Sequence, residues 1–317
     1  MIRFILRRCA IGLVLVWIVL TLIFLALHLV PGDPAALLLG GEGSGTPTPE
    51  ALAQVRERLG LNDPFLVQYW NYLSGLFQGN LGTSFRDGSP VAGFIATRLP
   101  NTLELVLVAS ILALVVGIPL GALAARRGGA VDTGVSLLTA IGLAVPVYVI
   151  GTVMVLVFAL TLRWFPAGGY VAFSEDPAGH LSRLVLPSIA IAMGITAVLA
   201  RMTRSSVIET MGQDWVRTAR SVGLGRGQVF QRHVMRNSLN PVVTSFGLEV
   251  GALIGSTVLI ERVFNWPGLG SLLIDAVLQR DYPIVQGVVI VVSVLFILIN
   301  IVVDVSYGLL DPRVRQS

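Results

Sequence analysis

The chain has 317 residues, of which 54% are hydrophobic and 13% are charged, about half the charged fraction of an ordinary soluble domain, which argues against a soluble globular protein. Its 22 basic and 18 acidic residues give a net charge of +4, too small an excess for a surface that binds nucleic acid through its phosphates. Every basic residue is Arg, and because a P-loop and Schiff-base chemistry both need Lys, a P-loop nucleotidase and Lys-based covalent catalysis are excluded. The single Cys9 and three scattered histidines argue against a metal site.

Six apolar runs are long enough to cross a bilayer as helices. A span needs about 20 residues, because an α-helix rises about 1.5 Å per residue and the hydrocarbon core is about 30 Å thick. The predicted spans, in chain order, are 9–30, 105–125, part of 133–162, 184–200, 241–260, and 283–303. Pro119, Pro146 and Pro187, inside or beside these spans, are expected to mark kinks. The predicted fold class is all-α, a polytopic membrane protein with six transmembrane helices.

Basic residues predict the orientation of these spans. Arg3, Arg7 and Arg8 precede the first apolar run, which exceeds the roughly 7–15 residues of a signal peptide and lacks a clear cleavage site. Residues 1–30 are therefore predicted to form a cytoplasmic N-terminus and an uncleaved span. The cytoplasmic side then receives three further basic segments, Arg126–Arg127, 204–236 and the tail 309–317. This agrees with the positive-inside rule, so both termini are expected in the cytoplasm.

The segment 31–99 is predicted to lie outside and to hold two short amphipathic helices. Thr48 is a candidate N-cap, followed by a proline at the first helical position, and Gly60 is a candidate stop. Asp63 and the proline after it predict a second helix, rich in aromatic residues, that ends at Gly79. Two interpretations of this aromatic helix are equally favoured: it packs on the membrane surface, or it docks an outside partner.

The cytoplasmic connection 206–240 is the most informative segment. Residues 214–222 are predicted to form a short helix that ends at Gly223 in the left-handed conformation, with Leu224 as its hydrophobic contact. A second amphipathic helix is predicted to follow, up to Asn237, before the fifth span. Positive-inside bias explains the arginines on these helices. It does not explain apolar faces on a connection too short to form its own core, which favours docking into a groove of another protein.

Two features of the spans point to packing and to a pathway. Gly247, Gly251 and Gly255 form a ladder of small residues that is typical of close helix packing. Glu249 lies about 200° round the helix from Gly247, and a carboxyl group in a span is expensive unless it meets a wet cavity or a partner. It is a candidate pathway residue. A structural ion pair with an arginine such as Arg201, or a protonated buried acid, is an equally favoured alternative. Asp304 is a second candidate, for which contact with lipid headgroups is the favoured interpretation.

The stretch Asp214-Trp-Val-Arg-Thr-Ala-Arg-Ser-Val-Gly-Leu224, followed by Arg232-His-Val-Met-Arg-Asn-Ser-Leu-Asn-Pro241, resembles the cytoplasmic coupling loop of a known family. The family comprises the inner-membrane permeases of binding-protein-dependent ABC importers, in the form of the oligopeptide, dipeptide and nickel group. Further matching segments cover almost the whole chain: 29–35, 59–64, 67–69, 79–84, 98–104 and 311–313. The long segment after the first span is similar to that of the first of the two permeases in such systems.

The wider importer family carries Glu-Ala-Ala, a Gly four residues later, and a subsequent Ile-x-Leu-Pro. Here Arg217, Thr218, Ala219 and Gly223 stand at the first positions, so the Glu is absent, and the Leu-Pro is absent as well. This departure resembles the peptide-group variant. The resemblance implies that the following residues couple the permease to its ATPases: Asp214, Trp215, Arg217, Thr218, Ala219, Gly223, Leu224, His233, Arg236 and Asn237.

The resemblance further implies the type I importer fold, with a core of residues 100–308 and the first span outside it. The implied partners are a second homologous permease, two ABC ATPase subunits, an extracytoplasmic solute-binding protein and the lipid of a bacterial plasma membrane. The chain itself would be non-catalytic and would bind no cofactor, with ATP and Mg²⁺ held by the ATPases. Di- and oligopeptides are the implied cargo, with nickel chelates or glutathione-like solutes as alternatives. A stand-alone secondary transporter or channel using Glu249 is the alternative from another class.

Overall fold

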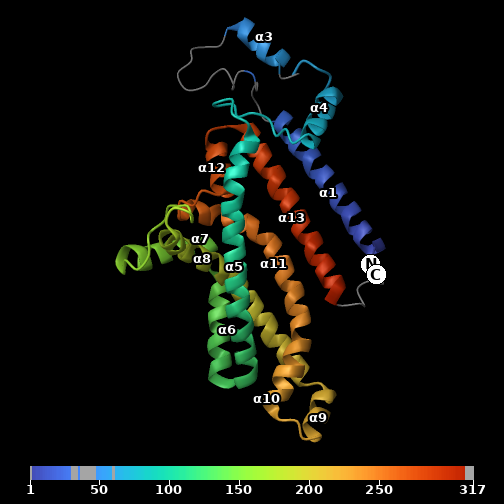
Figure 1. Ribbon diagram of the computed structural model, residues 1–317, viewed down its shortest axis with the longest axis vertical. Helices are drawn as coiled ribbons and strands as arrows, with labels where there is room; N and C mark the ends of the chain where they lie inside the picture. The colour runs from blue at the N-terminus through green and yellow to red at the C-terminus, as the bar shows by residue number, and fades with distance from the viewer. Residues whose placement is uncertain (1, 30–34, 36–47, 59–60, 311–317) are drawn as a thin grey trace.

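The computed structural model describes residues 2–29, 35, 48–58 and 61–310. Within these residues every regular element is a helix, apart from one isolated bridge between Thr83 and Pro90. Long helices run side by side to form an elongated bundle, with α1 (Ile2–Leu29) along its edge and short helices at both ends (Figure 1). The predicted all-α fold class is confirmed.

Among the described residues, five helical stretches are individually long and apolar enough to cross a membrane. They contain α1, α5 (Val91–Arg127), α8 (Pro177–Met211), α11 (Met235–Val263) and α13 (Tyr282–Leu310). They correspond to the first, second, fourth, fifth and sixth predicted spans. α5 and α8 extend well beyond the apolar runs 105–125 and 184–200 from which they were predicted, so they project from the membrane-spanning region.

The third predicted span is a bent pair of helices. α6 (Gly129–Ala144) is followed by α7 (Val147–Met154), which continues into the π-helical turn η1 (Val155–Thr161), and the two arms meet at 103°. Pro146 stands at the bend, where it precedes α7. Because proline disfavours the helical conformation in the residue before it, Val145 is extended, with φ −91° and ψ 125°. The described part of the chain therefore has six candidate spans if this pair counts as one crossing.

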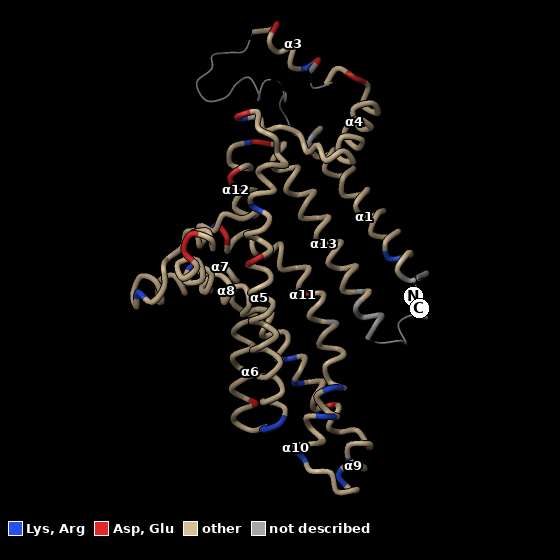
Figure 2. The backbone as a smooth tube through the Cα atoms, viewed as in Figure 1, with Lys and Arg blue, Asp and Glu red and all other residues tan. Residues whose placement is uncertain are grey.

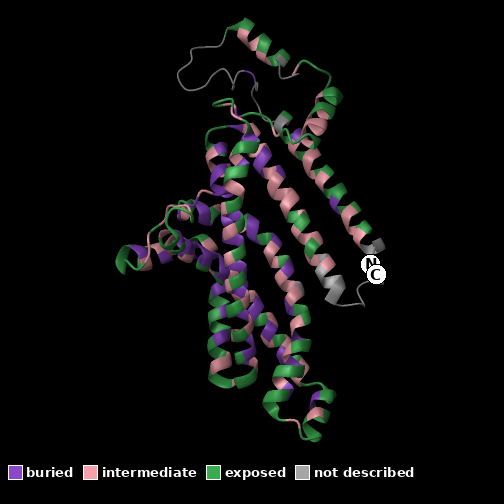
Figure 3. Cartoon of the chain, in the orientation of Figure 1, coloured by how far each residue is buried: buried purple, intermediate pink, exposed green. Residues whose placement is uncertain are grey.

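α5 and α8 form the centre of the bundle. Gly121 of α5 approaches α8 so closely that a Cβ atom on it would lie 2.3 Å from the backbone oxygen of Ala200, the type of close approach that small residues permit between membrane helices. Pro119 and Pro187 lie inside these two helices without interrupting them. The main apolar core is built from α5, α7, α8 and α11, where buried residues concentrate (Figure 3).

The second cytoplasmic helix and the fifth span form one continuous helical stretch. α10 (Arg226–Val229), the π-helical turn η2 (Phe230–Val234) and α11 follow one another without a break. Pro241 removes one backbone hydrogen bond from this helix, but contacts with α8 support the same region. Ser206 donates its hydroxyl to the carbonyl oxygen of Ser238 at 2.9 Å, and Ser238 donates to the carbonyl oxygen of Ser206 at 3.3 Å.

In the segment between the first two spans, α3 (Pro49–Arg58) begins as predicted. The hydroxyl oxygen of Thr48 accepts a hydrogen bond from the backbone N–H of Ala51 at 3.3 Å, which satisfies one of the free donors of the first turn. Gly60, the predicted stop, lies outside the described residues. The N-cap of α3 is therefore confirmed.

The aromatic helix α4 (Phe65–Phe77) also forms, with one difference at its start. Pro64 occupies the N-cap position and no side chain caps the helix, so Asp63 lies one residue before the cap. The carbonyl oxygen of Pro64 accepts the first hydrogen bonds of the helix, from the N–H groups of Val67 at 2.8 Å and Gln68 at 3.1 Å. Gly79 turns the chain after the helix with φ 77°, as predicted.

Residues 79–90 form a short turn-rich segment held against the start of α13. The buried carboxyl group of Asp281 accepts hydrogen bonds from the hydroxyl of Ser84 and, at 3.2 Å, from the backbone N–H of Phe85. These contacts join the segment before α5 to the start of the last span, so the N-terminal ends of α5 and α13 are fixed relative to each other.

Candidate functional site

The short helix α9 (Asp214–Ser221) lies at the far end of the bundle from α3 and α4 (Figure 1). It ends in the predicted manner. Gly223 has φ 92°, its N–H donates to the carbonyl oxygen of Arg220 at 3.1 Å, and the N–H of Leu224 donates to that of Ala219 at 3.3 Å. This is the Schellman arrangement, in which glycine supplies the left-handed residue. The predicted helix and its stop are confirmed.

One face of α9 packs on the chain itself, contrary to expectation. Val216 is fully buried in a small cluster with Val207 of α8, Val229 of α10 and Val234 of η2. The half-buried residues at the edge of this cluster include Ala219 and Leu224. The argument that the connection is too short to form a core is therefore wrong. It missed that α8 and the α10–α11 helix project beyond the bundle and supply the other walls.

The opposite face of α9 is exposed and carries large apolar side chains. Trp215 of α9 is 38% exposed, and Val222, which follows the helix as its C-cap, is 72% exposed. Asp214 and Arg217 form a surface ion pair of 3.6 Å. Surface ion pairs contribute little to stability. We call Trp215, Arg217 and Val222 the outer face of α9. Of the other predicted coupling residues nearby, Ala219 and Leu224 are half-buried.

The remaining predicted coupling residues lie on the neighbouring helix. His233, Arg236 and Asn237 are exposed at the junction of η2 and α11, and Thr218 is exposed on α9 with its hydroxyl bonded to the carbonyl oxygen of Asp214 at 3.1 Å. Arginines gather at this end of the bundle, whereas acidic residues lie mainly toward the other end (Figure 2). The candidate coupling surface is therefore basic and partly apolar.

Glu249 lines a cavity on the side of α11 that faces α7 and α8. The cavity has a volume of about 390 Å³ and its walls come from α6, α7, α8 and α11. Glu249 is its only charged lining residue among those described, and Ser256 is a second polar one. No hydrogen bond or ion pair joins Glu249 to another residue in the described part of the chain. The alternative of an ion pair with Arg201 is not found among these contacts.

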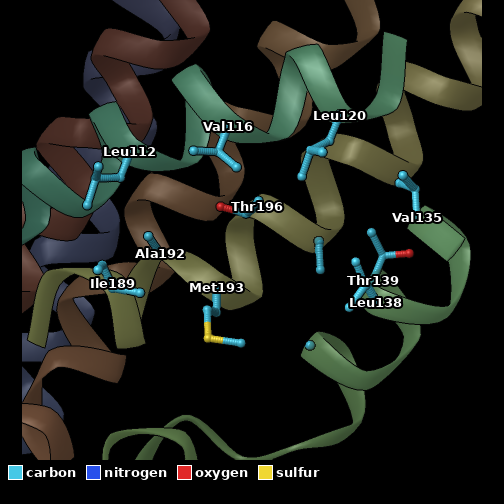
Figure 4. A pocket seen from close by; sticks show the side chains of 12 residues that line it. Leu112, Val116, Leu120, Val135, Leu138, Thr139, Ile189, Ala192, Met193 and Thr196 are labelled. Carbon is cyan, nitrogen blue, oxygen red and sulfur yellow. The ribbon is translucent and has the colours of Figure 1, made fainter. Parts of the chain in front are cut away.

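A second cavity, of about 400 Å³, lies between α5, α6 and α8 (Figure 4). Its lining is almost entirely apolar, with Leu112, Val116 and Met193 on the walls. The hydroxyl of Thr139, one of the few polar groups there, is already bonded to the carbonyl oxygen of Ser136 at 2.9 Å. This cavity offers no free charge to orient a polar cargo, so the cavity at Glu249 is the stronger candidate for a pathway.

Two of the three glycines of the predicted ladder pack against a neighbouring helix. A Cβ atom on Gly247 would lie 2.0 Å from Val303 of α13, and one on Gly251 would lie 3.1 Å from Asn300. Gly255 has no such neighbour and borders a groove between α1, α11 and α13. Asp304 lies in α13, but its side chain lies outside what the structure describes.

Sequence reasoning missed a polar network between the N-terminal part of α5 and the C-terminal end of α11. Glu261 is fully buried and accepts hydrogen bonds from the hydroxyl of Thr102 at 2.7 Å and from the backbone N–H of Ser271 at 2.9 Å. Nearby, the Nε2 atom of His180 lies 2.8 Å from a carboxyl oxygen of Glu104. Of these residues, only Thr102 and Glu104 lie in a motif quoted above. The network was missed because Glu261 and His180, their partners, are far from them in sequence.

Comparisons with known proteins agree with this architecture. Residues 117–316 match the family described as binding-protein-dependent transport system inner membrane component, and residues 1–106 match the N-terminal part of such membrane components. The chain is similar to the solved MetNI methionine ABC transporter, with a TM-score of 0.56 and 17% identity over 69% of this chain and 96% of that chain. This likeness shows the fold, which is that of an ABC importer permease as predicted.

Relatives align over nearly their full lengths. A Brucella abortus protein described as a peptide transport system permease is 43% identical over 99% of both chains. An oligopeptide transport system permease of Bacillus subtilis is 37% identical over 99% of this chain and all of that one. A glutathione transport system permease of Salmonella choleraesuis is 39% identical over the whole of both. This chain therefore belongs to the family of binding-protein-dependent transport system inner membrane components.

Proposed function

We propose that the chain is a permease subunit that forms the translocation pathway for di- and oligopeptides in an ATP-driven importer of a bacterial plasma membrane. The observation that carries this proposal is the near-complete alignment with permeases named for peptide and oligopeptide transport. The glutathione permease among the relatives fits the same chemistry, because glutathione is a modified tripeptide. Competition between a dipeptide, an oligopeptide and glutathione for uptake separates these cargoes.

The chain would work with a second homologous permease, two ABC ATPase subunits and an extracytoplasmic solute-binding protein. ATP and Mg²⁺ would be bound by the ATPases, and this chain would hold no cofactor. The gathering of arginines around α9 and α10 supports a cytoplasmic location of this end, and hence of both termini. Membership of the importer family supports the existence of such partners.

The outer face of α9 would receive the ATPases. Closure of an ATPase dimer around ATP would displace α9. The buried contacts of Val216 with Val207, Val229 and Val234 would pass that displacement to α8 and α11 as rigid bodies. Nucleotide can shift the conformational equilibrium only through contacts that differ between the states. α9 is suited to this because its inner face is fixed to two long helices while its outer face is free.

Glu249 would contact the cargo in its cavity. A peptide carries an ammonium group, and a carboxyl group without a partner in the described structure is available to bind it. The apolar walls of the cavity would exclude water around this contact. In this proposal Glu249 orients cargo while the solute-binding protein selects it.

A pair of matched substitutions tests the docking surface. Val222→Asp places a charge on the outer face of α9, and Val277→Asp makes the same change at an exposed position of α12 (Leu269–Leu278), near the end of that helix and at the opposite end of the molecule. We expect Val222→Asp to lose co-purifying ATPase subunits and ATP-dependent uptake, while Val277→Asp retains the ATPases. Retention of ATPases by both variants would contradict the assigned docking surface.

A further inference from the structure

The helix α4 has two different faces and no charged residue along its entire length, Phe65–Phe77. A helix that docks a soluble partner surrounds its apolar core with a polar rim, whereas a helix that lies within a membrane interface exposes one apolar face, rich in Trp, Phe and Leu, to the lipid. The sequence leaves two interpretations of α4 open, packing on the membrane surface and docking of an outside partner. The contacts of each face of the helix decide between them.

The inner face of α4 is fixed on α1. Thr21 donates its hydroxyl to the carbonyl oxygen of Trp17 at 2.8 Å, so the phenol of Tyr69, 2.6 Å away, donates to Thr21. Tyr72 donates to the carbonyl oxygen of Leu20 at 3.4 Å. The ring of Phe24, which is 5% exposed, lies within about 5 Å of three aromatic rings of α4. Burial in this cluster raises the pKa of the Tyr72 phenol.

The outer face of α4 is a continuous apolar stripe. Leu66, Trp70 and Phe77 are spaced by four and seven residues, so they lie on one side of the helix, and they are 76%, 70% and 90% exposed. No described residue of the chain covers them. α4 lies alongside the end of α1, and its outward side is mostly exposed (Figure 3).

The contacts with α1 fix the depth of α4. The apolar span of α1 is Ile5–Ala26, and only 11% of its most apolar window is buried within the chain, so this helix faces lipid. Thr21 lies five residues before Ala26, which is about 7–8 Å along a helix axis. Tyr69 therefore reaches inside the end of an apolar span. On either side of Thr21 in sequence, α1 also exposes apolar side chains, at Trp17 and Leu22.

We propose that α4 is an interfacial membrane helix, with Leu66, Trp70 and Phe77 inserted between the headgroups and acyl chains of the leaflet at this end of α1. The occupant of the stripe is lipid. Three observations carry this proposal: the large apolar side chains exposed on one side of α4, the depth of its contacts on α1, and the apolar side chains that α1 itself exposes near those contacts. The helix anchors the segment between the first two spans to the bilayer, whatever cargo the transporter carries.

Spin labels at single cysteines test the proposal. Cys9, the only cysteine of the chain, is replaced by Ser, and the full chain carries one label at a time after Trp70→Cys or Phe77→Cys. Leu13→Cys, on the exposed surface of α1, and Glu57→Cys, on the exposed surface of α3, provide the lipid and water references. The variants are reconstituted in vesicles of phosphatidylethanolamine and phosphatidylglycerol, and each label's relaxation by oxygen and by a neutral water-soluble nickel complex is measured.

We expect the labels at positions 70 and 77 to behave like that at position 13, with oxygen access exceeding nickel access, and the label at position 57 to show the reverse. All four sites are exposed, so labelling should leave folding intact, and each label's access is read directly. Nickel access at positions 70 and 77 equal to that at position 57 would overturn the proposal and favour a surface for a protein partner. Protection of both labels from both reagents would overturn it as well, because the stripe would then be covered by protein.

Discussion

Replacing Glu261 with Ala is expected to destabilise strongly the end of the bundle where α5, α11 and α12 meet. The carboxyl group is fully buried and joins three helices, because α11 carries it, α5 donates through Thr102, and α12 donates through the backbone N–H of Ser271. The substitution leaves these two buried donors without an acceptor. Each such loss costs about 1–3 kcal/mol, so the expected loss is about 2–6 kcal/mol.

Thermal unfolding of the purified chain in detergent, followed by tryptophan fluorescence, measures this effect. Trp266 is a suitable reporter because it is buried next to the network and its indole N–H donates to the carbonyl oxygen of Asn101 at 3.0 Å. With about 2–4 °C per kcal/mol for chains of about 150–250 residues, we expect the midpoint to fall by at least about 4 °C. Glu249→Ala is the matched control, since Glu249 makes no such bonds among the described residues. Equal midpoints for the two variants would refute the reasoning.

Three further outcomes are expected. Gly247→Ala forces a methyl group against Val303 and should lower the free energy of unfolding by about 1–3 kcal/mol. Gly255→Ala meets open space and should leave the unfolding midpoint at or above that of the parent chain. A lower midpoint for Gly255→Ala than for Gly247→Ala would contradict the packing of Gly247 on α13. Val216→Ala removes two buried methyl groups and should weaken the packing of α9 by about 1–3 kcal/mol. The measurement is hydrogen exchange, in which the backbone amides of α9 should exchange faster while those of the other helices are unchanged. Glu249→Gln should reduce peptide uptake while ATPase subunits still co-purify, and unchanged uptake would remove Glu249 from the pathway.

Elements governed by local chemistry were predicted well from the sequence. The N-cap at Thr48, the left-handed glycine at Gly223 and the bend at Pro146 were confirmed. These features depend on residues within one helical turn, where a single residue type decides the conformation. The apolar runs identified the spans for a similar reason, since each run alone decides whether a helix can cross the bilayer.

Features that depend on distant contacts were missed. Glu261 directly follows the fifth predicted span in sequence, and only the fold places Thr102 of α5 within hydrogen-bond distance of it. The packing of Val216 was missed because the projecting lengths of α8 and α10–α11 exceed their apolar runs. Hydropathy marks where a helix leaves the membrane and gives no information on where the helix ends.

The most direct test of the account asks whether the chain moves cargo without partner ATPases. The purified chain is placed in vesicles, and uptake of a labelled dipeptide is measured under a proton or sodium gradient, first alone and then with its ATPase and permease partners, its solute-binding protein and ATP. The account predicts no uptake by the chain alone and ATP-dependent uptake by the complete assembly, which is lost in Val222→Asp. Gradient-driven uptake by the chain alone would contradict the account and favour a secondary transporter.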